Sequence, residues 1–508
     1  MLKKQFIINH TQFETRIAAL DGAKLTDLYF SRPKTGSMMG HIYKGKIDRI
    51  LPNMQAAFVD IGLDRSAFLL GSDVLTEEMA AEFLKSGQNG EEPADDEEIE
   101  QYFRSHKKPI EKTLKEGQEV LVQVVKDSIG MKGPRVSMFI SLPGRYLVLM
   151  PLVSHVGISR KISDQSLRQR LKKLAKGFNK DNLGVIFRTA AASVSDEITR
   201  NDFFELENQW KTIKDIYFKT KMPELVFEEI SAAKKLLRDH FDQDVEKIVV
   251  DDKKVFEELK DYAQKILPEA VTRLDHYHQL HPIFDVYGIE LEIQKCLERR
   301  IDLPSGGHLV IDQTEALTSF DVNSGRFVSR SNPAEAIYKI NLEAAEVIAW
   351  QIRLRNLGGI IVLDFIDMEV EQHKEKLFLY LQDLLKDDRA RPHILKVNEF
   401  GLVQMTRKRT SESIPRLLTT ECPKCQGRGF IKSVSTEFYD FIREIKRYCA
   451  RNAPKKLTVK LTSALYDLAL IDNKHEISEI AKNYRVHFKF EKMKREPRLD
   501  AEKSFVIG

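Results

Sequence analysis

Two stretches of the chain, LTSFDVNSG at residues 317–325 and GGIIVLDFIDM at residues 358–368, carry most of the information about its fold and chemistry. Each has apolar and β-branched residues between glycine or asparagine breakers, a pattern that predicts a short strand. Asp321 and Asn323 are two positions apart, so we expect both side chains on one face of the first strand. Asp364 lies in an apolar run that we expect to be buried on both faces, where a bare carboxylate is costly unless a cation or strong donors meet it.

The segment between these strands, residues 334–359, predicts a helix that connects them. One apolar face recurs every three or four residues, at Ile337, Ile340, Ala344, Ile348 and Ile352. Gly358 and Gly359 then end the helix. Because a strand–helix–strand crossover normally places its two strands parallel and adjacent, we expect Asp321 and Asp364 to converge although they are 43 positions apart.

Two converging carboxylates and an amide oxygen would form an oxygen-only site of the kind that holds Mg²⁺. A second interpretation of the same residues is that the acids cap turns or pair with arginines. Spacing alone leaves both open. The basic residues that follow could either contact phosphates or form a solvated rim, and the sequence favours neither: Arg389, Arg391, Arg407 and Arg409.

Length and composition predict a soluble protein of several domains. The chain has 508 residues, of which 42% are hydrophobic and 31% charged. No apolar run approaches the ~18 residues that a membrane span requires, and the N-terminus has no secretion signal. Four cysteines do not make a disulfide framework, which fits a reducing cytoplasm. The net charge of +4 by itself indicates no partner.

Residues 5–30 predict a β-hairpin with its turn at Asp21 and Gly22. So short a segment cannot bury a core alone, so we expect it to complete a sheet whose other strands come later. Residues 235–307 alternate helical and strand patterns and are the candidate for those strands. The domain is therefore expected to be split by an insertion.

Short strands and polar turns follow from residue 40 to residue 70, and they resume at residues 116–142. Phe58 and Phe68 are ten positions apart, among the basic residues Lys44, Lys46 and Arg49. Aromatic and basic side chains on a small barrel form the surface that binds single-stranded nucleic acid. The alternative is that both phenylalanines belong to the core.

An acidic stretch at residues 91–100, with seven acids in ten positions, separates the two halves of the predicted barrel. It is read either as a regulatory or RNA-mimicking segment or as a solvated loop. Further on, Arg188 and Thr189 directly follow an apolar strand. A guanidinium and a hydroxyl there could bind a terminal phosphate, because arginine supplies a planar fork of donors.

Cys422 and Cys425 form a C-x₂-C motif that offers half of a tetrahedral zinc site. The other cysteines, Cys296 and Cys449, belong to no second motif. The pair could be a redox pair, recruit a distant histidine, or share Zn²⁺ with a second copy of the chain. Arithmetic favours sharing, since two chains supply four thiolates.

These motifs together resemble the ribonuclease E/G family, over residues 1 to about 500. The resemblance is carried by YKGKI and AAFVDIG near the N-terminus, by FDVNSG, by NLEAAEVIAWQIRLRNLGGIIVLDFIDM and by NEFGLVQMTRKR. It implies a multidomain α/β and α+β chain. An S1-type OB barrel is inserted in a split RNase H-like domain, followed by a deoxyribonuclease-I-like catalytic subdomain, a zinc link and a small α/β domain. Without a long tail rich in Pro and Arg, the chain is most like the short ribonuclease G form.

The resemblance also implies domain boundaries. They are 1–36 with 235–298 for the split structural domain, 37–137 for the barrel with its acidic insertion 71–115, 138–234 for a 5′-phosphate sensor region, 299–418 for the catalytic subdomain, 419–432 for the zinc link and 433–508 for the small oligomerisation domain.

Site residues follow from the resemblance position by position. Asp321 and Asp364 would hold Mg²⁺ with Asn323 assisting, whereas Asp367, three residues on, is expected on the opposite strand face and outside the site. The other implied residues are Phe58, Phe68 and Lys132 for RNA, Gly144, Val148, Arg188 and Thr189 for a 5′-monophosphate with Arg160 assisting, and Cys422 and Cys425 for a Zn²⁺ shared between two chains. Asp251 and Asp252 are not carried over as catalytic.

The function implied is a Mg²⁺-dependent endoribonuclease that cleaves single-stranded RNA in rRNA and tRNA processing and mRNA decay. It would favour 5′-monophosphorylated substrates and leave 5′-phosphate and 3′-hydroxyl ends. The family also implies a cytoplasmic homodimer joined by the zinc link, or a homotetramer. A non-catalytic RNA-binding scaffold is the alternative, and a DNA nuclease is a third reading.

Overall fold

The computed structural model describes residues 4–32, 37–76, 79, 108–128, 133–178, 183–221, 223–325, 333–396, 398, 401–409, 411–493 and 505–507. The chain divides into two compact units, Met1–Ile414 and Pro415–Gly508, each with its own core. Within these described ranges, no helix has both the length and the apolar character needed to cross a bilayer.

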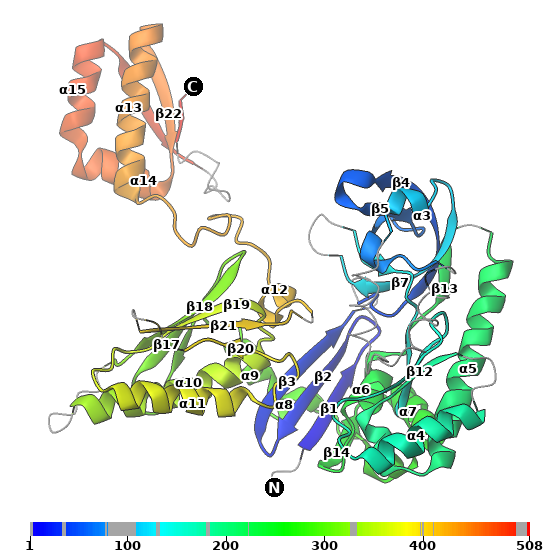
Figure 1. Ribbon diagram of the computed structural model, residues 1–508. Helices are drawn as coiled ribbons and strands as arrows, with labels where there is room; N and C mark the ends of the chain where they lie inside the picture. The colour runs from blue at the N-terminus through cyan, green and yellow to red at the C-terminus, as the bar shows by residue number, and fades with distance from the viewer. Residues whose placement is uncertain are drawn as a thin grey trace. The chain divides into compact units, whose positions relative to one another are not determined.

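The N-terminal strands belong to a five-stranded sheet that later residues complete (Figure 1). Its strand order is β15 (Leu274–His276), β14 (Val245–Val250), β1 (Lys4–His10), β2 (Thr15–Asp21) and β3 (Lys24–Ser31). Residues 5–30, predicted as one hairpin, form three strands, because β1 is a separate strand that also pairs with β2. The turn at Asp21 and Gly22 joins β2 to β3, and Gly22 takes φ +62° there, which glycine adopts without strain. β1 pairs parallel with β14, so the sheet is completed by later strands as predicted. Helices α6 (Ala232–His240) and α7 (Lys253–Ile266) supply the apolar side chains that cover it.

Five short strands close into a barrel. They are β4 (Ile42–Leu51), β5 (Ala56–Asp60), β6 (Ala67–Leu70), β8 (Arg135–Ser137) and β7 (Glu119–Lys126), and pairing of β4 with β7 completes the closure. Strand β13 (Glu224–Phe227) adds to β4. The closed barrel is consistent with the S1-type OB fold expected from the sequence. The acidic stretch 91–100 lies outside the described residues.

A four-stranded sheet follows the barrel. Its order is β11 (Val156–Ile158), β12 (Gly184–Phe187), β10 (Leu147–Met150) and β9 (Leu142–Pro143). Helices α4 (Gln165–Phe178) and α5 (Asp196–Lys219) pack on it, and their apolar faces share one core with β10 and β12.

The sheet that carries the two predicted acids has six strands. They are, in order, β16 (Arg300–Asp302), β17 (His308–Gln313), β18 (Leu317–Asn323), β19 (Gly359–Asp364), β21 (Leu402–Arg407) and β20 (His393–Ile394). Helices α10 (Pro333–Leu354) and α11 (Glu371–Leu385) lie against one face of this sheet (Figure 1). α10 connects β18 to β19, which are parallel neighbours, as the strand–helix–strand pattern predicted.

Contacts between α10 and β3 join this sheet to the N-terminal sheet. The indole Nε1 of Trp350 donates to the carbonyl of Leu25 at 2.6 Å. The guanidinium of Arg353 makes two hydrogen bonds to the carboxylate of Asp27. Among the described residues of this unit, the remaining short helices are η1 (Pro52–Met54), η2 (Gly71–Asp73), α3 (Ile110–Thr113), η4 (Thr189–Ser193), η5 (Pro268–Arg273), α8 (Ile283–Val286) and α9 (Ile289–Lys295).

The second unit is a small α/β fold around a three-stranded sheet. The strands are, in order, β23 (His487–Lys492), β22 (Lys456–Leu461) and β24 (Phe505–Ile507). Its helices are α12 (Ile414–Leu418), which begins at the boundary, α13 (Val434–Asn452), α14 (Ser463–Asp467), the π-helical turn η6 (Leu468–Asp472) and α15 (Lys474–Tyr484). Cys449 on α13 is part of its apolar core. The RNase H-like and deoxyribonuclease-I-like assignments and the exact domain boundaries stay predictions.

Candidate functional site

Asp321 and Asp364 are direct neighbours across two parallel strands. Asp321 on β18 is paired in register with Asp364, the last residue of β19. Both side chains are exposed at the ends of their strands. The crossover through α10 has therefore brought the two carboxylates together, as the sequence predicted.

The burial expected for Asp364 was wrong. Ile361 and Leu363 of β19 are fully buried, whereas Ile360 is 51% exposed and Asp364 is exposed as well. The reason is that α10 and α11 cover only one face of the sheet. Alternation along the strand places Asp364 on the other, open face, where a carboxylate remains hydrated.

Two further groups act on this pair of acids. The side-chain amide of Asn323 donates from Nδ2 to Oδ2 of Asp321 at 2.9 Å. The pKa of Asp364 is raised by partial burial, then by the negative charges of Asp321 and Asp367. Strand alternation does not apply to Asp367, because β19 ends at Asp364. That Asp367 lies outside the site stays a prediction.

The donor chemistry of this cluster fits a hard divalent cation. Its atoms are carboxylate and amide oxygens, which Mg²⁺ prefers. Neither Asp321 nor Asp364 forms an ion pair with a described residue, which argues against the alternative of arginine pairing. In the described part of the chain no three His, Cys, Asp or Glu side chains cluster around one point, so the fit rests on two carboxylates and the Asn323 amide.

Phe58 and Phe68 face each other on the outside of the barrel. They are cross-strand partners on β5 and β6, with ring centroids 5.9 Å apart. Their neighbours on each strand are buried in the barrel core, whereas both phenylalanines are half-buried. Alternation therefore turns both rings outward, contrary to the interpretation that they are core residues.

The basic residues near these rings divide into two kinds. Arg49 is exposed and lies opposite Phe58 on the neighbouring strand β4. Lys44, expected among the surface cations, is buried, and its Nζ contacts the carbonyl of Thr220 at 2.7 Å and Glu119 at 2.8 Å. Lys132 lies outside the described residues.

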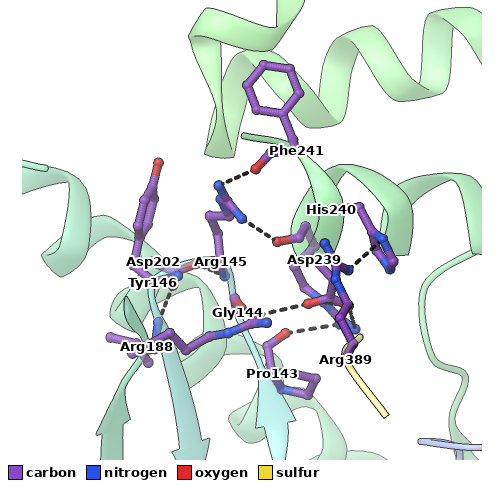
Figure 2. A network of polar contacts seen from close by, with 12 residues as sticks. Pro143, Gly144, Arg145, Tyr146, Arg188, Asp202, Asp239, His240, Phe241 and Arg389 are labelled. Carbon is purple, nitrogen blue, oxygen red and sulfur yellow. Dashed lines mark hydrogen bonds and ion pairs between the residues drawn. The ribbon is translucent and has the colours of Figure 1, made fainter. Parts of the chain in front are cut away.

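Two of the residues predicted for a 5′-phosphate pocket, Arg188 and Gly144, are in direct contact (Figure 2). Arg188 follows β12, and its Nη1 donates to the carbonyl of Gly144 at 2.6 Å. The hydroxyl of Thr189 is 3.3 Å from that of Ser159. Val148 on β10 is buried in an apolar cluster. Arg188, directly after β12, and Thr189, the first residue of η4, are thus an adjacent cation and hydroxyl, with Ser159 adding a second hydroxyl.

Gly144 is required by a buried acid behind the loop. A Cβ at Gly144 would lie 2.6 Å from Oδ2 of Asp202, closer than side chains approach. The Asp202 carboxylate accepts the backbone N–H groups of Arg145, Tyr146 and Leu147. Burial raises the pKa of Asp202, and these three donors oppose that rise. Asp202 thereby fixes the loop that presents the Gly144 carbonyl to Arg188.

Sequence reasoning missed Asp239, which forms an ion pair with Arg188 at 2.8 Å. Asp239 lies on α6, 51 positions further along the chain, and no periodicity or motif connects the two. The next residue, His240, contacts Nη1 of Arg389 through its Nδ1 at 2.6 Å (Figure 2). Burial, followed by the charge of Arg389, lowers the pKa of His240 to about 4.

Cys422 and Cys425 lie in a tight turn of the second unit. The carbonyl of Cys422 accepts from the backbone of Gln426 at 2.8 Å, and that of Cys425 from Arg428 at 3.0 Å. Hydrogen bonds from the backbone of Cys425 and Lys424 lower the pKa of the Cys422 thiol, which favours the thiolate that binds metals. Cys296 and Cys449 are both buried, whereas Cys422 is exposed.

Comparison with known proteins identifies the family of the chain. A model described as "Ribonuclease E/G family" matches residues 141–410, and one described as "RNase E/G, Thioredoxin-like domain" matches residues 421–502. A protein named Ribonuclease G from Salmonella typhimurium (strain SL1344) is 40% identical over 94% of both chains. Ribonuclease G from Escherichia coli (strain K12) is 39% identical over 94% of both chains.

The chain belongs to the Ribonuclease E/G family. A protein named Ribonuclease E from Haemophilus influenzae is 34% identical over 95% of this chain, but that match covers only 50% of the relative. The chain is therefore more similar to these Ribonuclease G relatives than to Ribonuclease E, as the sequence predicted.

Proposed function

We propose that this protein is a magnesium-dependent endoribonuclease that cleaves single-stranded RNA, favours 5′-monophosphorylated substrates and leaves 5′-phosphate and 3′-hydroxyl ends. The enzyme class rests on the relatives, because near full-length similarity to proteins named Ribonuclease G makes the chain an endoribonuclease of that family. The single observation that supports the site is the register of Asp321 directly opposite Asp364 on an open sheet face.

Asp321 and Asp364 would hold the ion, with Asn323 orienting Asp321 through its 2.9 Å hydrogen bond. When bound, Mg²⁺ would supply Lewis-acid polarisation of the scissile phosphate and help to activate a water. The pKa of Asp364 is raised by partial burial and then by the charges of Asp321 and Asp367, and the cation would offset these two charges. Asp367 adds negative charge beside this cluster and so increases its attraction for a cation.

The barrel would bind the unpaired bases of the RNA, and Arg188 with Thr189 would bind its 5′-phosphate. Phe58 and Phe68 present an outward aromatic pair on which unpaired bases can stack, with Arg49 beside them for the backbone. Arg188 and Thr189 present a guanidinium and a hydroxyl suited to a terminal phosphate. These assignments support a preference for single strands with a 5′-monophosphate.

Cys422 and Cys425 would hold a structural Zn²⁺ together with the same residues of a second copy. Their turn is exposed, and two thiolates leave half of a tetrahedral site unfilled. We therefore propose a homodimer joined by zinc, located in the cytoplasm. The tetramer, rRNA and tRNA processing, and mRNA decay follow from the family resemblance as further proposals.

One experiment separates this proposal from an RNA-binding scaffold and from a DNA nuclease. A single-stranded RNA is offered with a 5′-monophosphate or a 5′-hydroxyl, beside a DNA of the same sequence, with Mg²⁺ or with EDTA. We expect cleavage of RNA only, only with Mg²⁺, and faster for the monophosphorylated RNA. Binding without cleavage would favour the scaffold, and cleavage of the DNA at a similar rate would contradict the proposal.

A further inference from the structure

The guanidinium of Arg188 is held by one of its three nitrogens. Nη1 donates to the Gly144 carbonyl at 2.6 Å and lies 2.8 Å from Oδ1 of Asp239. Nε and Nη2 of Arg188 make no hydrogen bond within the part of the chain that the structure describes. The edge formed by Nε and Nη2 is the one with which arginine makes two parallel hydrogen bonds to a phosphate.

Asp239 is itself firmly held (Figure 2). Its Oδ2 accepts from Nε of Arg238 at 3.2 Å and from Nη2 at 2.9 Å. The side chain of Arg238 is only 8% exposed, and its Nη1 donates to Glu229 at 2.8 Å and to the carbonyl of Pro143 at 3.0 Å. One buried arginine therefore anchors both Asp239 and the residue before Gly144, so the two partners of Arg188 are fixed relative to each other.

Charge keeps this arrangement in place at neutral pH. Burial alone would raise the pKa of Asp239, but the hydrogen bonds and charge of Arg238, followed by the charge of Arg188, hold it below its usual value. Asp239 is therefore ionised. Its carboxylate spans two arginines, with one oxygen directed at each.

We propose that Asp239 is a positioning residue for 5′-end selection: it fixes Nη1 of Arg188 so that the Nε–Nη2 edge is presented to a 5′-monophosphate. This inference rests on the proposed function of the Arg188 pocket. A long arginine side chain that is already ordered loses less rotamer freedom when it binds a ligand. Asp239 thus acts through Arg188 and need not touch the RNA.

The test measures binding of an uncleavable 2′-O-methyl RNA by the full chain. For each variant, the dissociation constant of the 5′-hydroxyl RNA is divided by that of its 5′-monophosphorylated twin. We expect R188A to lower this ratio to about 1, because the guanidinium itself makes the contact. Loss of one positioning contact in D239A should lower the ratio about threefold to tenfold. D239N should give a ratio between those of the wild type and D239A, since its amide offers one oxygen to the two arginines and turns an NH₂ group toward the other.

D275A is the matched control, because Asp275 pairs with Lys247 at 2.6 Å on the same sheet unit and has no contact with Arg188. A general loss of folding changes both dissociation constants together and leaves the ratio unchanged. An unchanged or increased ratio in D239A would overturn the inference, the increase meaning that Asp239 competes with the phosphate. A wild-type ratio of 1 would refute the 5′-end preference itself.

Discussion

Replacement of Asp364 with asparagine should stabilise the metal-free protein while it abolishes cleavage. Asp321 and Asp364 are directly opposite each other, and the pKa of Asp364 is raised by partial burial and by the charges of Asp321 and Asp367. Two like charges ~5 Å apart in water repel each other by about 1 kcal/mol, and salt lowers this value. Asparagine keeps the shape of the side chain and removes the repulsion, so D364N should gain up to about 1 kcal/mol without metal.

Mg²⁺ should stabilise D364N against thermal unfolding only weakly, because the variant retains one of the two carboxylates. Metal-ion catalysis supplies several kcal/mol of transition-state stabilisation, so the cleavage rate should fall by about a thousandfold or more. RNA binding should stay close to wild type, since Phe58 and Phe68 lie in the barrel.

The assay compares thermal unfolding with and without Mg²⁺, together with RNA cleavage, for the wild type, D364N and D312N. Asp312 lies on β17 of the same sheet and pairs with Arg299, so D312N controls for loss of a carboxylate from this sheet. D312N should keep both the Mg²⁺ response and cleavage. A D364N protein that is less stable than the wild type without metal, or that cleaves RNA at the wild-type rate, would refute this reasoning.

Three more predictions test the surfaces around this site. Phe58→Ala should weaken single-stranded RNA binding by about fivefold to a hundredfold, measured by fluorescence anisotropy, because stacking on an aromatic ring is worth roughly 1–3 kcal/mol per base; an unchanged affinity would exclude Phe58 from the interface. The purified protein should contain one zinc per two chains, and Cys422→Ser should lose both zinc and dimer in metal analysis and light scattering; one full zinc per chain would contradict sharing. His240 has a folded pKa of about 4 and an ordinary value near 6.5, so its stabilising contribution is complete above pH 6.5 and is lost as the pH falls toward 4. The free energy of unfolding, measured with urea, should therefore fall by about 2 kcal/mol more between pH 7 and pH 5 in the wild type than in His240→Asn. Equal decreases in the two proteins would contradict that pKa.

The sequence was sufficient to predict that Asp321 and Asp364 meet. A strand, an amphipathic helix and a second strand restrict the connection to a parallel crossover, which places the two strands side by side. The sequence allowed Phe58 and Phe68 to lie either on the barrel surface or in its core. Alternation along β5 and β6 shows that the rings face outward only once the residues of the barrel core are known.

Other features depend on contacts that no local pattern records. The run IIVLDFI reads as buried on both faces, yet Ile360 is half exposed because helices cover one face of the sheet alone. Lys44 reads as a surface cation, yet its ammonium is buried against Thr220 and Glu119. Arg188 and Asp239 are far apart in the sequence and no motif connects them, so only the folded chain reveals their ion pair.

The central claim is that Asp321 and Asp364 bind a catalytic divalent cation. Anomalous diffraction from crystals soaked in Mn²⁺, which substitutes for Mg²⁺ in oxygen-ligand sites, tests it most directly. We predict one strong peak between the two carboxylates in the wild type and none there in D364N. A wild-type crystal with no peak between Asp321 and Asp364, under conditions in which the protein cleaves RNA, would contradict the claim.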